Sequence, residues 1–143
     1  MSRNLDKRPG LNLLSLDGGG ITGLSSLLII KEIMLGIQGK QRLEAVPKPC
    51  EHFDIIAGTG TGAISAVMLG RLQMSVDEAI TSYVKQMGAV FSERKYSITG
   101  NTGTFKATVL ERQLKEMVRG ATGNENDRMK AQVQGEAESQ CKV

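Results

Sequence analysis

The sequence is poor in residues on which several classes of protein depend. Only 3% of its 143 residues are aromatic, tryptophan is absent, and there is one histidine, His52. Nucleic-acid binding is not predicted, because the lysines and arginines are scattered and few aromatic side chains accompany them. The two cysteines, Cys50 and Cys141, lie far apart without CxxC spacing, so neither a disulfide framework nor a metal site is predicted. We expect no cofactor and a reducing, cytoplasmic location.

Long apolar runs are also scarce. The opening residues, MSRNLDKRPG, lack the apolar stretch that a signal peptide needs. The richest apolar run, at residues 24–30, is about two helical turns long, so no membrane-spanning segment is expected. The net charge of +3 is small, and charges on solvated faces are the preferred interpretation. Weak peripheral contact with an anionic membrane surface is left open.

The chain alternates short apolar segments with amphipathic ones. Strands are predicted over residues 11–16 and 53–57, and helices over 21–38, 61–72, from 75 onwards and over 106–119. The third helix opens with SVDE, which has capping-box spacing. In the first helix the predicted core face is Leu24, Leu27, Leu28, Met34 and Leu35, with the stem of Lys31. In the third helix it is Ala79, Ile80, Tyr83, Val84 and Met87, and in the fourth it is Val109, Leu110, Leu114 and Met117.

A strand, a helix and a second strand form a βαβ unit, which predicts an α/β fold with a parallel sheet. We assign residues 1–143 to one partial domain, with a core over about 11–119 and a polar loop or tail over 120–143. Residues 92–104 are predicted to be a loop. Only two strands are evident, which is few for such a sheet, and residues 141–143 resemble a third strand just beginning. These features favour a truncated domain.

Three glycines follow the first predicted strand, in the motif DGGGITG that begins at Asp17 and ends at Gly23. Successive glycines let backbone N–H groups converge, and the positive end of the following helix adds to their field. Such a loop can hold a phosphate or the oxyanion formed during acyl transfer. The formal GxGxxG match to a dinucleotide-binding loop is weak. Glu44 is the acid near the required spacing, but it lies in a proline-containing connection with no strand before it.

The second motif, GTGTG from Gly58 to Gly62, again lies between a strand and a helix. A nucleophile elbow is a G-x-S-x-G turn with a strained central residue and small flanking residues. Here the central residue is Gly60, which has no side chain. Thr59 and Thr61 are expected to project away from this apex. The motif also resembles the glycine-rich loop of tubulin-like GTPases, although the other loops of that domain are not visible. A Walker A loop is not matched.

Together, LLSLDGGGITGLSSLLIIKEI and FDIIAGTGTGAISAVMLGRL resemble the patatin-like phospholipases, in a likeness that covers residues 11–119. The family pattern is a DGGGxRG oxyanion loop followed by a GTSTGG elbow. The resemblance implies a three-layer α/β sandwich that hydrolyses acyl esters of phospholipids and related lipids with a Ser–Asp dyad. It also implies an oxyanion-hole motif of Asp17, Gly18, Gly19, Gly20 and Gly23, and an elbow frame of Gly58, Thr59, Gly60, Thr61 and Gly62.

The sequence departs from the family pattern at three places. Gly60 stands at the nucleophile position, and Thr22 stands where the family has an arginine or lysine. The dyad aspartate of the family lies in a D-G-G/A motif, and no Asp-Gly pair occurs after Gly20. Ser65 is expected to be packed or hydrogen-bonded to backbone, and His52 to have a structural role. We therefore expect no catalytic residue in this chain and no ester hydrolysis.

Two other functions are kept as alternatives. The chain could be a lipid- or anion-binding regulatory pseudoenzyme, because the DGGG loop is intact and a phosphate head group or fatty-acid carboxylate suits it. A nucleotide-binding module is the less favoured alternative. The expected partner is a phospholipid or another acyl-ester lipid, as the resemblance implies.

Overall fold

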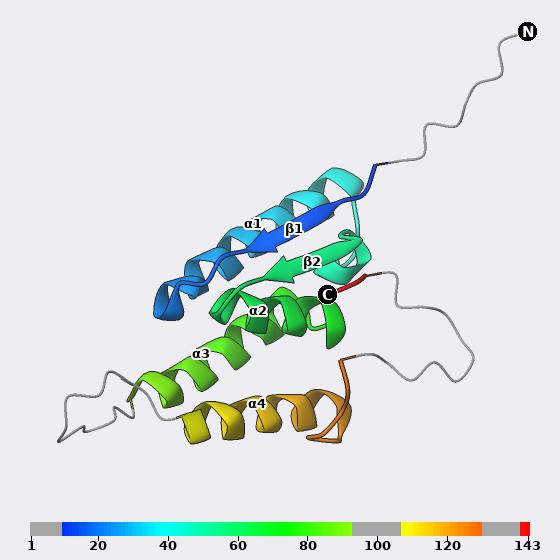
Figure 1. Cartoon of the computed structure of the whole chain (residues 1–143). Coiled ribbons are helices and arrows are strands. Elements are labelled where there is room, and N and C mark those ends of the chain that lie inside the picture. Colours follow the sequence, from blue (N-terminus) through cyan, green and yellow to red (C-terminus); the bar gives the residue numbers. More distant parts are fainter. Residues whose placement is uncertain (1–9, 93–106, 130–140) are drawn as a thin grey trace, which may run out of the picture.

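Two short parallel strands form a small sheet, and the helices pack beside it (Figure 1). The computed structural model describes residues 10–92, 107–129 and 141–143. In this part of the chain the elements are β1 (Leu13–Leu16), η1 (Gly20–Thr22), α1 (Gly23–Gln41), η2 (Pro49–Glu51), β2 (Ile55–Gly58), α2 (Thr61–Ala66), η3 (Val67–Arg71), α3 (Val76–Ser92) and α4 (Ala107–Thr122). Most of the loop predicted over 92–104 lies outside the described residues.

The strands pair in register, with Leu13 opposite Ile55 and Leu16 opposite Gly58. Because they are parallel, the glycine motifs that follow them emerge at the same edge of the sheet. The α/β class with a parallel sheet, predicted from the βαβ pattern, is confirmed. The strands themselves start two residues later than predicted in each case.

The far end of the chain returns to the free edge of β2, close to the point marked C in Figure 1. Lys142 forms a parallel bridge with Ile55, and the N–H of Ile56 donates to the carbonyl oxygen of Lys142 at 2.8 Å. A Cβ at Gly70 in η3 would overlap the side chain of Val143, so this glycine makes room for the returning chain. Lys142 thus forms an isolated bridge at the position where the sequence suggested a third strand, and the sheet of the described residues has two strands.

One face of the small sheet carries the core. Leu16 and Ile56 are buried there, whereas Leu13 on the opposite face is 63% exposed and Ala57 is also exposed. The core is completed by buried residues of the helices: Leu27, Ile30, Met34, Ala66, Met68, Leu69, Val76, Ala79, Tyr83, Met87 and Met117. In the described part of the chain, helices therefore cover a single sheet face.

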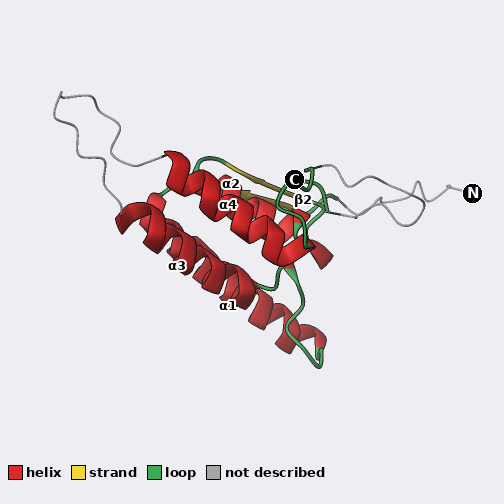
Figure 2. Cartoon of the chain, turned by 90° about the horizontal axis from the view of Figure 1, so that it is seen from below, coloured by secondary structure: helices red, strands yellow, loops and turns green. Residues whose placement is uncertain are grey.

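Helix α1 packs along α3 (Figure 2), and its buried stripe agrees only in part with the predicted one, since Leu27 and Met34 are buried as predicted. The buried stripe includes Leu27, Ile30 and Met34, whereas Leu28 is 48% exposed and Leu35 is 37% exposed, so these two predictions were wrong. The reason is that α1 is apolar on nearly every side. Its sequence pattern therefore does not determine which stripe meets the neighbouring helix.

The expectation about membrane-spanning length was also wrong for this helix. Residues Gly20–Gln41 form a 22-residue helical segment that is long and apolar enough to cross a bilayer by length and composition. Leu27 and Met34 nevertheless contribute fully buried side chains to the core of this domain. The apolar side chains of α1 that do not pack in the core are exposed on its other sides, where Ile29 is 62% exposed and Ile33 is 43% exposed.

Helices α3 and α4 pack side by side and bury one amide each, Gln86 and Gln113. Val84, predicted to face the core, is 52% exposed, because the buried stripe of α3 runs through Tyr83, Gln86 and Met87 instead. Helix α4 reaches Thr122, three residues into the segment expected to be loop or tail. It ends at Gly123, whose φ of +79° suits a left-handed helix cap.

Candidate functional site

The turn after β2 has the backbone shape of a nucleophile elbow. β2 ends at Gly58, and α2 begins at Thr61. Between them Gly60 takes φ +56° and ψ −127°, a backbone conformation that residues other than glycine rarely adopt. The N–H of Gly62 donates to the carbonyl oxygen of Thr59 at 2.9 Å, which closes the turn. The chain therefore keeps a turn that would be strained for any residue except glycine, and Gly60 has no side chain to present there.

The two glycines that flank this apex pack backbone against backbone. A Cβ at Gly62 would overlap the carbonyl oxygen of Leu16, and it would lie 2.7 Å from that of Asp17. A Cβ at Gly58 would in turn overlap the carbonyl group of Gly62. Hydrogen is the only side chain that fits at either position. Gly60 differs, because a Cβ there would have Gly18 Cα as its nearest neighbour, at 3.6 Å.

The loop after β1 lies against this turn, so the two glycine motifs meet. A Cβ at Gly18 would lie 2.9 Å from the carbonyl oxygen of Thr59 and 3.5 Å from Gly60 Cα. Gly19 N and Gly20 N donate to Thr61 Oγ1 at 3.2 and 3.0 Å. Two segments about forty residues apart in the chain are thereby joined at one edge of the sheet.

Side chains outside the motif hold the far side of the same loop. Thr22 Oγ1 donates to the carbonyl oxygen of Gly19 at 2.7 Å. The hydroxyl of Tyr83, a buried residue of α3, donates to the carbonyl oxygen of Gly20. A Cβ at Gly23 would overlap this hydroxyl, so the last glycine of the motif admits the tyrosine. The sequence predicted Tyr83 only as a core residue. A buried tyrosine usually needs a hydrogen-bond partner, and this rule was the available signal.

Other candidates for catalysis lie away from the apex. Ser65 is buried in α2 and its Oγ donates to the carbonyl oxygen of Thr61 at 3.5 Å, as expected for a packed helical serine. Asp54 accepts from Asn12 N at 2.7 Å and precedes β2, at the strand end opposite the elbow. His52 precedes it and its carbonyl oxygen accepts from the Asn12 side chain. Neither Asp54 nor His52 is therefore placed to serve as a base at Gly60.

No group of three or more potential metal ligands occurs among residues 10–92, 107–129 and 141–143. Cys141 is buried and Cys50 is half-buried, and this burial raises the pKa of both thiols. A raised pKa keeps a thiol protonated and unreactive near neutral pH.

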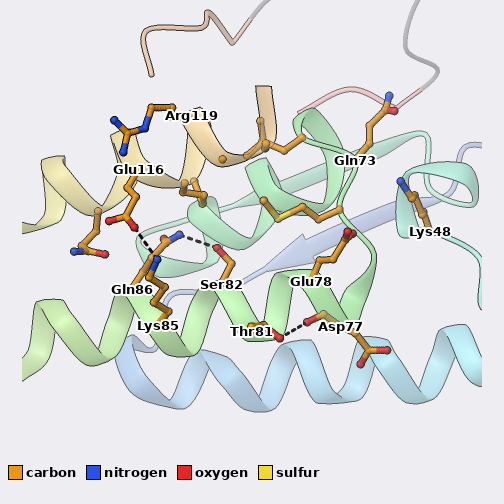
Figure 3. A pocket seen from close by; sticks show the side chains of 16 residues that line it. Lys48, Gln73, Asp77, Glu78, Thr81, Ser82, Lys85, Gln86, Glu116 and Arg119 are labelled. Carbon is orange, nitrogen blue, oxygen red and sulfur yellow. Dashed lines mark hydrogen bonds and ion pairs between the residues drawn. The ribbon is translucent and has the colours of Figure 1, made fainter. Parts of the chain in front are cut away.

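A groove of the described structure lies elsewhere, between α3 and α4 (Figure 3). It has a volume of about 930 Å³ and mixed charge, with an ion pair of 2.6 Å between Lys85 Nζ and Glu116 Oε1 on its wall. Gln86 Nε2 donates to Ser82 Oγ at 2.7 Å, while its Oε1 is buried and has no hydrogen-bond partner among the residues that the structure describes. None of the glycines of the two motifs lines this groove. The groove and the two glycine motifs are therefore separate candidate sites in different parts of the molecule.

A parallel α/β unit with an elbow turn beside a glycine loop is the backbone arrangement typical of hydrolases that catalyse acyl transfer. The family model described as patatin-like phospholipase matches residues 14–137, and this chain belongs to that family.

Named relatives agree with the family match. The chain is 38% identical over 88 residues to the calcium-independent phospholipase A2-gamma of Homo sapiens, covering 61% of this chain and 10% of that protein. It is 37% identical over 86 residues to phospholipase A I of Arabidopsis thaliana, covering 60% of this chain and 6% of that protein. It is also 37% identical over 86 residues to the cGAMP-activated phospholipase of Vibrio cholerae, covering 60% of this chain and 24% of that protein. The chain thus spans a tenth or less of the length of the first two relatives. No solved structure matches it.

Proposed function

We propose that this chain keeps the frame of a patatin-like lipid acyl hydrolase but does not hydrolyse acyl esters. The observation that carries the proposal is Gly60, which holds the elbow conformation without a nucleophile. Loss of a nucleophile that works with its base lowers turnover by roughly a million-fold. The remaining oxyanion donors would leave a rate enhancement of about 10³–10⁴ over the reaction in water.

A fluorophosphonate probe tests this proposal, because it forms a covalent bond with an activated serine. The unchanged chain should incorporate no probe. Gly60→Ser is the matched variant, since a Cβ at residue 60 meets nothing closer than Gly18 Cα at 3.6 Å. The backbone conformation of Gly60 costs about 1–3 kcal/mol for a residue other than glycine, so this variant should still fold. Stoichiometric labelling of the unchanged chain would contradict the proposal.

Binding of a lipid or anion without turnover is the second candidate function. It is favoured by the glycine loop, which lies at the start of α1 with Gly18 and Gly19 exposed. The exposed apolar residues Ile21, Ile29 and Ile33 offer one means of contact with a lipid surface. The ligand class suited to the loop is a phosphate head group or a fatty-acid carboxylate.

Flotation with phosphatidylglycerol vesicles tests this second candidate. The unchanged chain should float with the vesicles, and Gly19→Asp should weaken binding, because a carboxylate at the loop repels the lipid anion. Gly120→Asp in α4 adds the same charge where a Cβ meets nothing within 4 Å, away from the exposed apolar residues of α1, and serves as the control. Equal binding by both variants would exclude the loop as the binding site.

A further inference from the structure

The two threonines beside the elbow apex have different surroundings. Thr61 Oγ1 accepts hydrogen bonds from Gly19 N at 3.2 Å and from Gly20 N at 3.0 Å. Thr59 is exposed, and its side chain makes no hydrogen bond within the described part of the chain. One hydroxyl of the elbow is therefore the acceptor for two amides of the glycine loop. The sequence-based expectation that both threonines project away from the apex did not foresee this contact.

The remaining backbone groups of the same two glycines are also engaged. The carbonyl oxygen of Gly19 accepts from Thr22 N at 3.1 Å and from Thr22 Oγ1 at 2.7 Å. The carbonyl oxygen of Gly20 accepts from the Tyr83 hydroxyl. The loop is thus held from both sides by side chains of its own domain.

Gly18 is different from its two neighbours. It is exposed, and its N–H has no hydrogen-bond acceptor among the residues that the structure describes. It is also the loop residue nearest to the apex, since a Cβ at Gly18 would lie 3.5 Å from Gly60 Cα. The amide that is free to meet a ligand is therefore the one beside the empty nucleophile position.

We infer that Thr61 determines which amides of the glycine loop can bind a ligand. Its hydroxyl oxygen accepts hydrogen bonds from Gly19 N–H and Gly20 N–H, so these two amides are occupied. Gly18 N–H then remains to bind the anionic oxygen of a phosphate or carboxylate. The inference rests on the second candidate function, anion or lipid binding at this loop. An anion that reaches all three amides must first displace the threonine hydroxyl. Charge-assisted hydrogen bonds are roughly twice as strong as neutral ones, so displacement is feasible but lowers affinity.

Thr61→Val tests the inference, because valine keeps the shape of threonine and removes the hydroxyl. Thr59→Val is the matched control on the other side of the apex, and Thr61→Ser restores a hydroxyl. Thr61→Ala removes the hydroxyl with less bulk, in case the valine variant does not fold. In ¹⁵N-labelled protein, we expect slow exchange of the Gly19 and Gly20 amides in the unchanged chain, in Thr59→Val and in Thr61→Ser. In Thr61→Val and Thr61→Ala both amides should exchange as fast as that of Gly18.

Titration with two probes then separates the sources of the anion. Inorganic phosphate represents a free anion, and dihexanoyl phosphatidate below its micelle concentration represents a lipid head group. In the unchanged chain the added probe should shift the Gly18 amide most. In Thr61→Val it should shift Gly19 and Gly20 as well, with affinity about tenfold higher, which corresponds to about one charge-assisted hydrogen bond. A response to phosphatidate alone assigns the loop to lipid, and a response to both probes assigns it to phosphate in general.

Three outcomes would overturn the inference. The first is unchanged exchange of Gly19 and Gly20 in Thr61→Val. The second is weaker binding by this variant, which would show that the hydroxyl supports the ligand site instead of competing for it. The third is an absence of binding by Thr61→Val, in which both amides are free. Fluorophosphonate labelling of the unchanged chain would contradict the absence of hydrolysis, yet it would leave these results unaffected, so the two failures are distinguishable.

Discussion

Where the two glycine motifs meet, backbone contacts backbone, whereas between α3 and α4 long polar side chains face one another. At Gly58 and Gly62 no atom beyond hydrogen fits. In the α3–α4 groove the Lys85–Glu116 pair is exposed, and the buried Oε1 of Gln86 lacks a hydrogen-bond partner in the described part of the chain. Only glycine can pack at these positions of the first region, whereas the second region can accept several different side chains. Substitutions should therefore have large effects in the first region and small ones in the second.

The largest effect on the stability of the protein is expected for Gly62→Ala. Its Cβ would overlap the carbonyl oxygen of Leu16, which belongs to a strand and cannot move aside. We expect a loss of about 3 kcal/mol or more in the free energy of unfolding, the upper range for overpacking. Denaturant unfolding followed by circular dichroism measures it. Gly36→Ala is the control, since its Cβ meets nothing within 4 Å and should raise helix stability by about 0.5–1 kcal/mol. Equal effects at both positions would remove the contrast between close-packed and open glycines.

A smaller effect of opposite sign is expected in the groove. Gln86→Met removes the partnerless acceptor and fills a similar volume, so it should stabilise the protein by about 1 kcal/mol. Ser82→Ala is the matched variant, because it removes the same Gln86–Ser82 hydrogen bond but leaves the buried amide in place. It should destabilise the protein by about 1 kcal/mol. Destabilisation by Gln86→Met as large as that by Ser82→Ala would show that Gln86 Oε1 is satisfied in solution.

The smallest effect concerns the start of α3, on the rim of the groove. Ser75 N and Ser75 Oγ donate to Glu78 Oε2 at 2.8 and 2.9 Å, and these bonds lower the pKa of Glu78 from its ordinary value of 4.5. A lowered pKa in the folded state means that the stabilisation is complete above pH 4.5 and is lost as pH falls through the folded-state pKa. Unfolding of Glu78→Gln should therefore depend less on pH below 4.5 than unfolding of the unchanged chain. Glu44→Gln, at an exposed site in the connection before β2, should leave this pH dependence unchanged.

Sequence reasoning predicted the parts of the fold that depend on local chemistry. Apolar runs followed by glycines indicated β1 and β2, and the spacing of SVDE indicated the start of α3. The burial of α1 was not predictable in the same way, because apolar residues occur on nearly all its sides. Leu28 and Ile30 therefore look equivalent in sequence, and only the position of α3 decides that Ile30 is buried.

At the candidate site, sequence reasoning predicted the residues that need to be glycine, but it missed the contacts that hold the loop. Gly58 and Gly62 follow from a rule about close backbone approach. The hydrogen bonds of Thr61 and Tyr83 join segments that are distant in the chain, and their partners are fixed only when β1, β2 and α3 are assembled. Such long-range pairs carry no local pattern that a single sequence could reveal.

The bridge between Ile55 and Lys142 imposes an order on folding. β1 and β2 are joined by a single crossover and can pair early, whereas the second edge of β2 waits for residues that follow α2, α3 and α4 in the chain. Closing so long a loop costs entropy that grows with the logarithm of its length, and non-local strand pairing is slow. Until residue 142 arrives, β2 presents an unpaired edge that other chains can extend. During synthesis, this edge of β2 therefore stays unpaired until residue 142 has been made.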